Sequence, residues 1–201
     1  MAEGVVKNRA WLTFAVGLLA ALGGGWFAVP WAMYRRSEQP VQFSHRVHTS
    51  EAVGLSCQDC HALSDGGKFG GIPRLETCAP CHAEPQGKSA DEKRFIKEYV
   101  AKNREVQWLV YARQPENVYF SHAPHIRLAG LKCEQCHGQH GTTDRLRTFE
   151  RNRISTYPRD VEGYSLVRLQ RSRWNEGMKM DDCSRCHHER GVEESCLTCH
   201  K

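Results

Sequence analysis

The sequence predicts a membrane-anchored domain of short helices and irregular loops that are wrapped around bound cofactors. Three observations lead to this fold class. Residues 10–34 contain no charged side chain, only 40% of the 201 residues are apolar, and the ten cysteines form five Cys-x-x-Cys pairs, each followed by a histidine. Because much of the apolar content lies in the early uncharged stretch, the remainder is too polar to build an ordinary hydrophobic core.

The N-terminal stretch predicts one transmembrane helix from Ala10 to Val29. A helix of this length rises about 30 Å, which matches the hydrocarbon core of a bilayer, and Pro30 is expected to end it. The stretch is longer than the apolar part of a usual signal peptide and lacks a clear Ala-x-Ala cleavage site. Residues 1–36 are therefore predicted to form an uncleaved membrane anchor, and residues 37–201 a separate domain.

The five Cys-x-x-Cys-His motifs are the attachment signature of c-type haem. Two thioether bonds hold the macrocycle, and the histidine after the second cysteine becomes the proximal ligand of the iron. A zinc ribbon also uses Cys-x-x-Cys pairs, but it has no need of a histidine after each pair. The predicted attachment residues are Cys57, Cys60, Cys78, Cys81, Cys133, Cys136, Cys183, Cys186, Cys196 and Cys199, and the proximal histidines are His61, His82, His137, His187 and His200.

Six further histidines are candidates for the distal ligands. Four of them lie in two copies of Phe-Ser-His-x-x-His, at 43–48 and 120–125, each about nine residues ahead of a haem motif. Two histidines so close together cannot easily bind one iron, so each pair is expected to join two haems. The six candidates are His45, His48, His122, His125, His140 and His188.

The repeat divides the second domain into two haem units, residues 43–82 and 120–200. The Phe-Ser-His-x-x-His segment recurs after 77 residues and the following cysteine pair after 76. The first unit has a second haem motif shortly afterwards, whereas the second unit has an insertion and then two motifs close together. We interpret the domain as two related units, the second of which has gained a terminal haem.

A helix is expected between the units, over about residues 90–104. Ser89 and Glu92 form a capping-box pattern, and Phe95 and Tyr99 lie on one helical face. The insertion from Thr142 to Met180 has no apolar period and is not expected to fold alone. It holds eight arginines, Arg145, Arg147, Arg151, Arg153, Arg159, Arg168, Arg171 and Arg173.

The basic character does not point to nucleic acid. The formal net charge of the polypeptide is +5, but two propionates on each haem and an iron centre of about +1 leave each oxidised haem with about −1, which cancels it. The arginines are interpreted either as partners of the propionates or as a docking strap on another subunit.

The combination of Phe-x-His-x-x-His with Cys-x-x-Cys-His resembles the class III, low-potential multihaem cytochromes c. The resemblance implies that His45 faces the haem on the first cysteine pair and His122 the haem on the third. It implies that His48, His125 and His188 serve other haems. Ala62 stands where small members often have a second histidine, so one distal ligand is left open, with His140 as its candidate.

Bis-histidine haems have no open iron position and therefore transfer electrons without binding substrate, and their low potentials suit a menaquinone-linked chain. None of the five motifs has a lysine in place of its histidine, as a catalytic multihaem reductase often has. Covalent haem attachment takes place outside the bacterial cytoplasm, so the haem domain is expected in the periplasm, on the outer face of the inner membrane.

A chain of this size with one anchor and five motifs also resembles the cytochrome subunits of larger quinone-linked complexes. These complexes join a molybdopterin-oxidoreductase-like protein, iron–sulfur subunits and a polytopic quinone-binding membrane protein. The resemblance implies a redox subunit that is not an enzyme on its own and that exchanges electrons with soluble periplasmic cytochromes c. The class III motifs favour a menaquinone reductase complex.

Two alternatives stay open at this point. One is the cytochrome subunit of a quinol-oxidising alternative complex III. The other is a stand-alone anchored quinol dehydrogenase, which typically has a methionine at the position of Leu63. The eleven histidines exceed by one the ten that five bis-histidine haems need. The surplus residue, His140 or His188, either makes a hydrogen bond beside a haem or belongs to a sixth, non-standard haem, as the resembling sulfate-reducer subunits imply, with Met178, Met180 or a partner subunit completing its shell.

Overall fold

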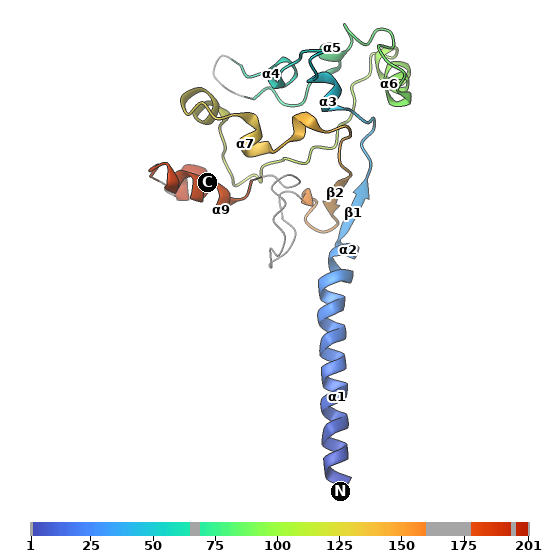
Figure 1. Cartoon of the computed structure of the whole chain (residues 1–201), viewed down its shortest axis with the longest axis vertical. Coiled ribbons are helices and arrows are strands. Elements are labelled where there is room, and N and C mark those ends of the chain that lie inside the picture. The colour runs from blue at the N-terminus through green and yellow to red at the C-terminus, as the bar shows by residue number, and fades with distance from the viewer. Residues whose placement is uncertain (1, 65–68, 160–177, 194–195, 201) are drawn as a thin grey trace.

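A long N-terminal helix stands apart from a domain of short helices, loops and one small sheet (Figure 1). The computed structural model describes residues 2–64, 69–159, 178–193 and 196–200. Helix α1 covers Ala2–Gly23, a wider π-type turn η1 covers Gly24–Ala28, and helix α2 covers Val29–Met33. The segment Ala10–Met33 is long and apolar enough to cross a membrane, and none of it is buried against the protein.

The prediction that Pro30 ends the membrane helix is wrong, because the helical path continues to Met33. Proline lacks the N–H that the helix interior needs, and its ring clashes with the carbonyl four residues earlier. Here the π-type turn over Gly24–Ala28 widens the helix just before the proline. Pro30 then falls in the first turn of α2, where no donor is required.

Every Cys-x-x-Cys-His motif overlaps a short helix of the domain, and three of these helices begin at the first cysteine of the motif. Segments of four or five residues do not hold a helix by themselves, so local caps contribute. The Asp59 carboxylate accepts hydrogen bonds from the Ser56 backbone N–H (2.6 Å) and hydroxyl (2.8 Å). The short helices and turns are α3 (His45–His48), α4 (Cys57–Cys60), α5 (Leu75–Cys78), η3 (Pro124–Leu128), α7 (Cys133–His137), η4 (His140–Thr142), α9 (Met180–Glu189) and α10 (Cys196–Cys199).

The helix that links the two units is shorter than expected. Helix α6 covers Ala90–Phe95 and a π-type turn η2 covers Ile96–Val100, so helical structure ends about four residues before the predicted boundary. Asn103 has a φ of 46°, a left-handed conformation that does not continue a right-handed helix. The Ser89 side chain does not cap the helix, so the predicted capping box is wrong as well.

The small sheet joins the base of the domain to the end of the long N-terminal helix. Strand β1 (Tyr34–Ser37) pairs antiparallel with β2 (Phe149–Asn152), with Arg36 opposite Glu150. Arg36 and Arg159 both contact the Glu150 carboxylate, at 2.7 and 2.6 Å. Part of the insertion thus forms a regular element by pairing with a strand that precedes it by more than a hundred residues, which the sequence pattern did not predict.

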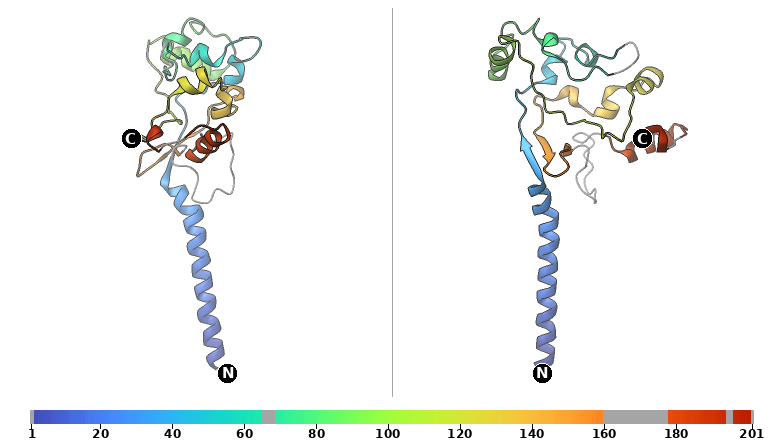
Figure 2. Two further views of the ribbon diagram at one scale, coloured as in Figure 1. Left: turned by 90° about the vertical axis from the view of Figure 1, so that its left-hand side faces the viewer. Right: turned by 180° about the vertical axis from the view of Figure 1, so that it is seen from behind.

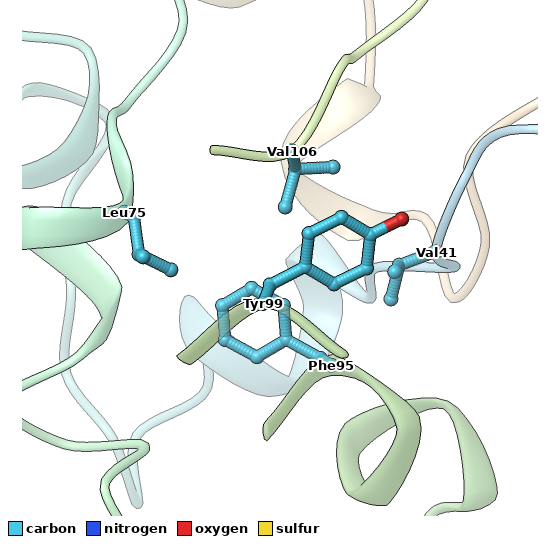
Figure 3. Packing of buried hydrophobic residues seen from close by; sticks show 5 residues of the cluster. All are labelled: Val41, Leu75, Phe95, Tyr99 and Val106. Carbon is cyan, nitrogen blue, oxygen red and sulfur yellow. The ribbon is translucent and has the colours of Figure 1, made fainter. Parts of the chain in front are cut away.

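The hydrophobic core is small and brings α5 of the first haem unit together with α6 and η2 (Figure 3). Phe95 and Tyr99 project from α6 and η2 toward residues from three other segments. This confirms the predicted apolar face of the linking helix. The buried cluster consists of Val41, Leu75, Phe95, Tyr99 and Val106.

The short helices that carry the haem motifs succeed one another across the domain. Helices α4 and α5 lie at the end far from the membrane helix, α7 lies in the middle, and α9 lies closest to the level of the sheet (Figures 1 and 2). Three of the insertion's arginines, Arg168, Arg171 and Arg173, fall outside the described residues.

Candidate haem-binding site

The two Phe-Ser-His-x-x-His segments hold their rings in the same arrangement, although the first is an α-helical turn and the second runs into the π-type turn η3. In the first, the Phe43 ring lies edge-on to His45 (4.8 Å between centroids) and parallel to His48 (4.3 Å). In the second, Phe120 lies edge-on to His122 (4.9 Å) and parallel to His125 (4.7 Å). In both units one phenylalanine therefore packs edge-on against the first imidazole and face to face against the second.

Each segment then turns toward the next haem motif through a glycine. Gly54 and Gly130 occupy equivalent positions and have φ values of 74° and 61°, a left-handed conformation that glycine adopts without steric cost. The leucine after each glycine donates its backbone N–H to the second histidine's carbonyl, Leu55 to His48 at 3.1 Å and Leu131 to His125 at 3.0 Å. We call this segment, residues 43–55 in the first unit and 120–131 in the second, the hairpin. It is a repeated structural unit as well as a repeated sequence.

Three distal candidates face a proximal candidate across a gap. The ring centroids are 6.0 Å apart for His48 and His82, 6.3 Å apart for His122 and His137, and 6.0 Å apart for His125 and His187. His122, the first histidine of the second pair, thus faces the haem motif that comes directly after the pair. His48 and His125, the second histidines, each face the motif after that one.

This separation is the one that two axial ligands of a single iron require. A metal–imidazole bond is about 2.0 Å long and the bound nitrogen lies about 1.1 Å from the ring centre, so two imidazoles on opposite sides of one metal have centroids about 6.2 Å apart. The spacing of the three pairs therefore fits a haem iron between the rings.

The hydrogen bonds of the histidines leave the correct nitrogen for a metal. His48 Nδ1 is 2.7 Å from the Ser44 carbonyl and His125 Nδ1 is 2.8 Å from the Ser121 carbonyl. His45, His61 and His82 also use Nδ1. For none of these five does Nε2 have a hydrogen-bond partner among the described residues, and an Nδ1–H bond of this kind is how proteins orient a metal-binding imidazole.

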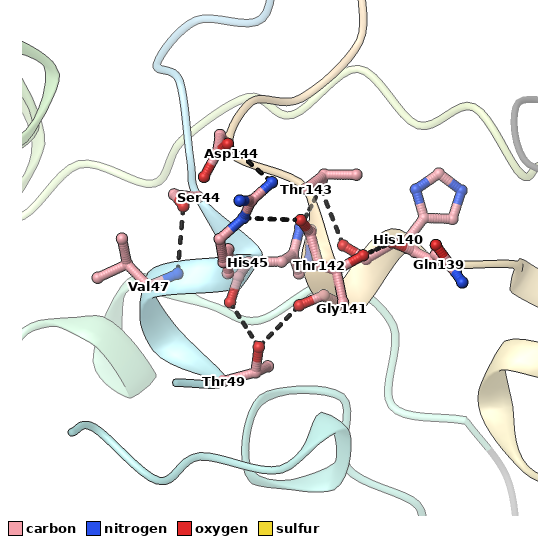
Figure 4. Close-up of polar contacts among 11 residues, drawn as sticks. Ser44, His45, Val47, Thr49, Gln139, His140, Gly141, Thr142, Thr143 and Asp144 are labelled. Atoms are coloured by element: carbon pink, nitrogen blue, oxygen red, sulfur yellow. Dashed lines mark hydrogen bonds and ion pairs between the residues drawn. The ribbon is translucent and has the colours of Figure 1, made fainter. Parts of the chain in front are cut away.

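His45 lies in a cluster with His61 and His140. Burial first, and then the nearby His61, His140 and His48, lower the pKa of His45 to about 4, so it is held in the neutral form that binds metals. The turn around η4 packs against α3 (Figure 4), where the Thr49 hydroxyl donates to the Gly141 carbonyl at 2.7 Å. The His140 ring points away from α3 in this view, toward surroundings that include His137 and Arg147.

The cysteine pairs form a continuous series of neighbours. Besides burial, a nearby cysteine raises a thiol pKa at four junctions between motifs. Cys60 acts on Cys78, Cys57 on Cys133, Cys186 on Cys136, and Cys199 on Cys183. The motifs are thus adjacent in the order second, first, third, fourth and fifth, counted along the chain. Phe69 adds a contact between the first and third, because its ring lies 5.9 Å from His61 and 4.9 Å from His122.

Some predicted site residues lie apart from a facing partner. His188 is exposed on α9, Met180 is 66% exposed, and His200 makes a backbone bridge with Val118. The described residues contain no group of three or more His, Cys, Asp and Glu side chains arranged to hold a metal ion directly, so a zinc-ribbon arrangement of the cysteine pairs is not present there.

Sequence reasoning missed the role of Glu92. Its carboxylate lies 3.0 Å from His82 Nδ1 and accepts hydrogen bonds from the backbone N–H groups of Gln86 (2.7 Å) and Gly87 (2.9 Å). Burial acts to raise the pKa of Glu92, but these hydrogen bonds and the nearby His82 outweigh it and lower the pKa. The position three residues after Ser89 suggested a helix cap, and no local signal indicated a histidine ten residues earlier.

Comparison with known proteins identifies the family. Residues 28–109 match the model of the class III cytochrome C family. Over 203 residues the chain is 38% identical to "Menaquinone reductase, multiheme cytochrome c subunit" of Nitratidesulfovibrio vulgaris, covering 94% of this chain and 89% of the relative. The chain belongs to the class III cytochrome c family. This confirms the family and the fold class predicted from the motifs, and class III cytochromes carry covalently bound haem c.

The family match covers the end of the membrane helix and the first haem unit of this cytochrome, whereas the relative spans nearly the whole chain. The match to the relative therefore extends well beyond the residues that the family model covers. The individual haem ligands stay predictions, which the geometry of the facing histidines supports.

Proposed function

We propose that this cytochrome is the electron-transfer subunit of a membrane-bound menaquinone reductase. The observation that carries the proposal is the continuous series of haem motifs with histidines facing one another at axial-ligand distance. The relative of the same type is named as the cytochrome subunit of such an enzyme, which favours this function over a stand-alone quinol dehydrogenase.

The ten cysteines would hold five haems through thioether bonds, and ten histidines would supply the axial ligands. The facing rings pair His48 with His82, His122 with His137 and His125 with His187, and the cluster around the first motif pairs His45 with His61. We assign His188 to the last motif because Cys183, on the same helix, lies near Cys199. His140 is then the surplus histidine.

Each haem would accept and donate one electron at a time, and the fold would determine which haems are neighbours. Cysteine neighbours connect the second motif to the first, the first to the third, the third to the fourth and the fourth to the fifth. Electrons would thus enter and leave at the two ends, near α5 and α10. With two histidines on each iron, no axial position would be left for a substrate. The subunit would therefore transfer electrons and would not be an enzyme on its own.

The anchor would cross the bacterial inner membrane once, with the N-terminus in the cytoplasm. Two features support this. Ala10–Met33 is long enough to cross, and covalent haem attachment occurs outside the cytoplasm, which puts residues 37–201 in the periplasm. The partners would be soluble periplasmic cytochromes c and the molybdopterin-oxidoreductase-like, iron–sulfur and polytopic quinone-binding subunits of the complex.

The haem count is tested by extraction. Acid acetone removes haem that lacks thioether bonds, so haem per chain is measured before and after the treatment. We expect five covalent haems, one for each Cys-x-x-Cys-His motif. An extractable fraction would instead identify the sixth, non-standard haem, with His140 as its first candidate ligand.

The function is tested by mild purification of the tagged full-length chain from its native membranes. We expect the partner subunits to co-purify, and the preparation to reduce a menaquinone analogue with electrons from a reduced periplasmic cytochrome c. A chain that purifies alone and reacts with quinone unaided would overturn the proposal. Net oxidation of quinol in place of quinone reduction would contradict it in favour of an alternative complex III.

A further inference from the structure

We propose that Glu92 is a positioning residue that lowers the reduction potential of the haem on Cys78 and Cys81. It does so by holding the Nδ1–H of His82 with a fixed carboxylate. The inference rests on the proposed role of His82 as a proximal ligand, and it adds a residue outside every haem motif to the control of electron transfer.

The contact between the two side chains is direct and sheltered. Glu92 Oε1 lies 3.0 Å from His82 Nδ1, and the side chains are 11% and 20% exposed. Nδ1 makes this contact, and the His82 ring centroid lies 6.0 Å from that of His48, the separation expected of two axial ligands. The imidazole thus has a carboxylate on one side and the predicted iron position on the other.

The carboxylate is held in place from two directions. The backbone N–H groups of Gln86 and Gly87 each donate to one of its oxygens. Gly87 approaches so closely that an added Cβ would lie 3.3 Å from Glu92 Oε2. On the other side, Phe95 on the same helix places its ring edge-on to His82 at 5.9 Å and is buried in the core. A helix fixed in this way holds Glu92 in one position.

The other described histidine contacts use weaker acceptors. Among the five histidines whose Nδ1 contacts are described, His48, His61 and His125 meet backbone carbonyls and His45 meets the Thr143 hydroxyl. Of these five, only His82 has a carboxylate. Charge-assisted hydrogen bonds are about twice as strong as neutral ones, and a carboxylate behind a metal-binding imidazole makes that imidazole a stronger donor to the metal.

A stronger donor favours the more highly charged, oxidised state of the iron. Hydrogen bonds to the residues that bind the iron, and charges close to them, are among the means by which a protein sets a haem potential. The affected haem stands at one end of the series of motifs, next to the first motif only. Glu92 would therefore set the potential at one of the two ends where electrons enter or leave.

The test is a redox titration of the purified full-length protein, with individual haems followed by their low-spin electron paramagnetic resonance signals. Glu92→Gln keeps the shape of the side chain and removes its charge. We expect one haem potential to rise while the other potentials stay unchanged and all five haems remain attached and low-spin. Glu92→Asp keeps the charge but withdraws it by one methylene, so a smaller rise of the same haem potential is expected.

Glu98→Gln is the matched control, because Glu98 lies six residues after Glu92, in η2, and pairs with Lys102. Its potentials should equal those of the unmodified protein. The proposal is overturned if Glu92→Gln gives the same potentials as Glu98→Gln. Failure of the ligand assignment would look different, because the unmodified protein would then show a high-spin haem or retain every low-spin signal in a His82→Ala variant.

Discussion

Each of the two haem units contains a hairpin of the same kind, but the residues that pack around the two units differ. In both, a phenylalanine orients two histidines, a left-handed glycine turns the chain, and the second histidine faces the following haem motif at 6.0 Å. The core cluster, however, lies within residues 41–106. In the described part of the second unit, only Phe149 is a buried hydrophobic residue.

The comparison distinguishes the hairpins, which form the candidate site in both units, from the core cluster, which stabilises the first unit. The facing distance is the same although the following motif begins 30 residues after His48 in the first unit and 58 residues after His125 in the second, counting to Cys78 and Cys183. The hairpin geometry is therefore local and independent of the core. We infer that the second unit depends more on its thioether and iron bonds for order.

The largest effect on stability is expected in the core of the first unit. Leu75→Ala should lower the free energy of unfolding by about 2–5 kcal/mol, because Leu75 is 6% exposed and packs against the core cluster. Leu128→Ala in the second unit, where the side chain is 86% exposed, should change it by less than about 0.5 kcal/mol. Denaturant unfolding of both variants checks the comparison, and equal losses would contradict it.

A smaller and equal effect is expected at the two phenylalanines. Phe43→Ala and Phe120→Ala should each cost about 2 kcal/mol, less than a fully buried ring, because Phe43 is half-buried, Phe120 is 38% exposed, and each packs on two histidines. Thermal unfolding measures the loss. Costs that differ by more than about 1 kcal/mol would show that the two hairpins are not energetically equivalent.

The smallest effect should distinguish the two serines. The Ser44 hydroxyl caps α3 by accepting the Val47 N–H at 3.2 Å, so Ser44→Ala should cost about 1 kcal/mol. Pro124 occupies the position equivalent to Val47 and has no N–H to donate. Ser121→Ala should therefore cost only a few tenths of a kcal/mol. The same unfolding measurement applies, and a larger cost at Ser121 would contradict the assignment.

Sequence reasoning could assign residues to the candidate site more fully than it could assign the scaffold around them. The hairpins follow from residue types at short spacing, so Phe43, His45 and His48 could be assigned together and matched to their copies. The pairing of Tyr34–Ser37 with Phe149–Asn152 could not be predicted, because neither strand has a pattern that selects the other. Such long-range pairing is decided by the folded chain.

Two misreadings have physical causes in the surroundings of the residues. A proline ordinarily ends a regular helix, but Pro30 follows the π-type turn over Gly24–Ala28 and lies in the first turn of α2, where it is tolerated. Glu92 has the spacing of a helix cap, yet the carboxylate binds His82 and the loop at Gln86 and Gly87. In both cases a neighbouring segment changed what the local pattern would have done alone.

The central claim is that His48 and His125 are axial ligands of the haems on the second and fourth motifs. It is tested most directly by His48→Met and His125→Met in the full-length protein, with Val47→Met, at an exposed position of the same hairpin, as the control. Histidine–methionine ligation raises a haem potential. The account predicts that each histidine variant raises the potential of one haem, a different haem in each, while all five haems stay attached and the control leaves every potential unchanged. Potentials that stay the same in both histidine variants would contradict it.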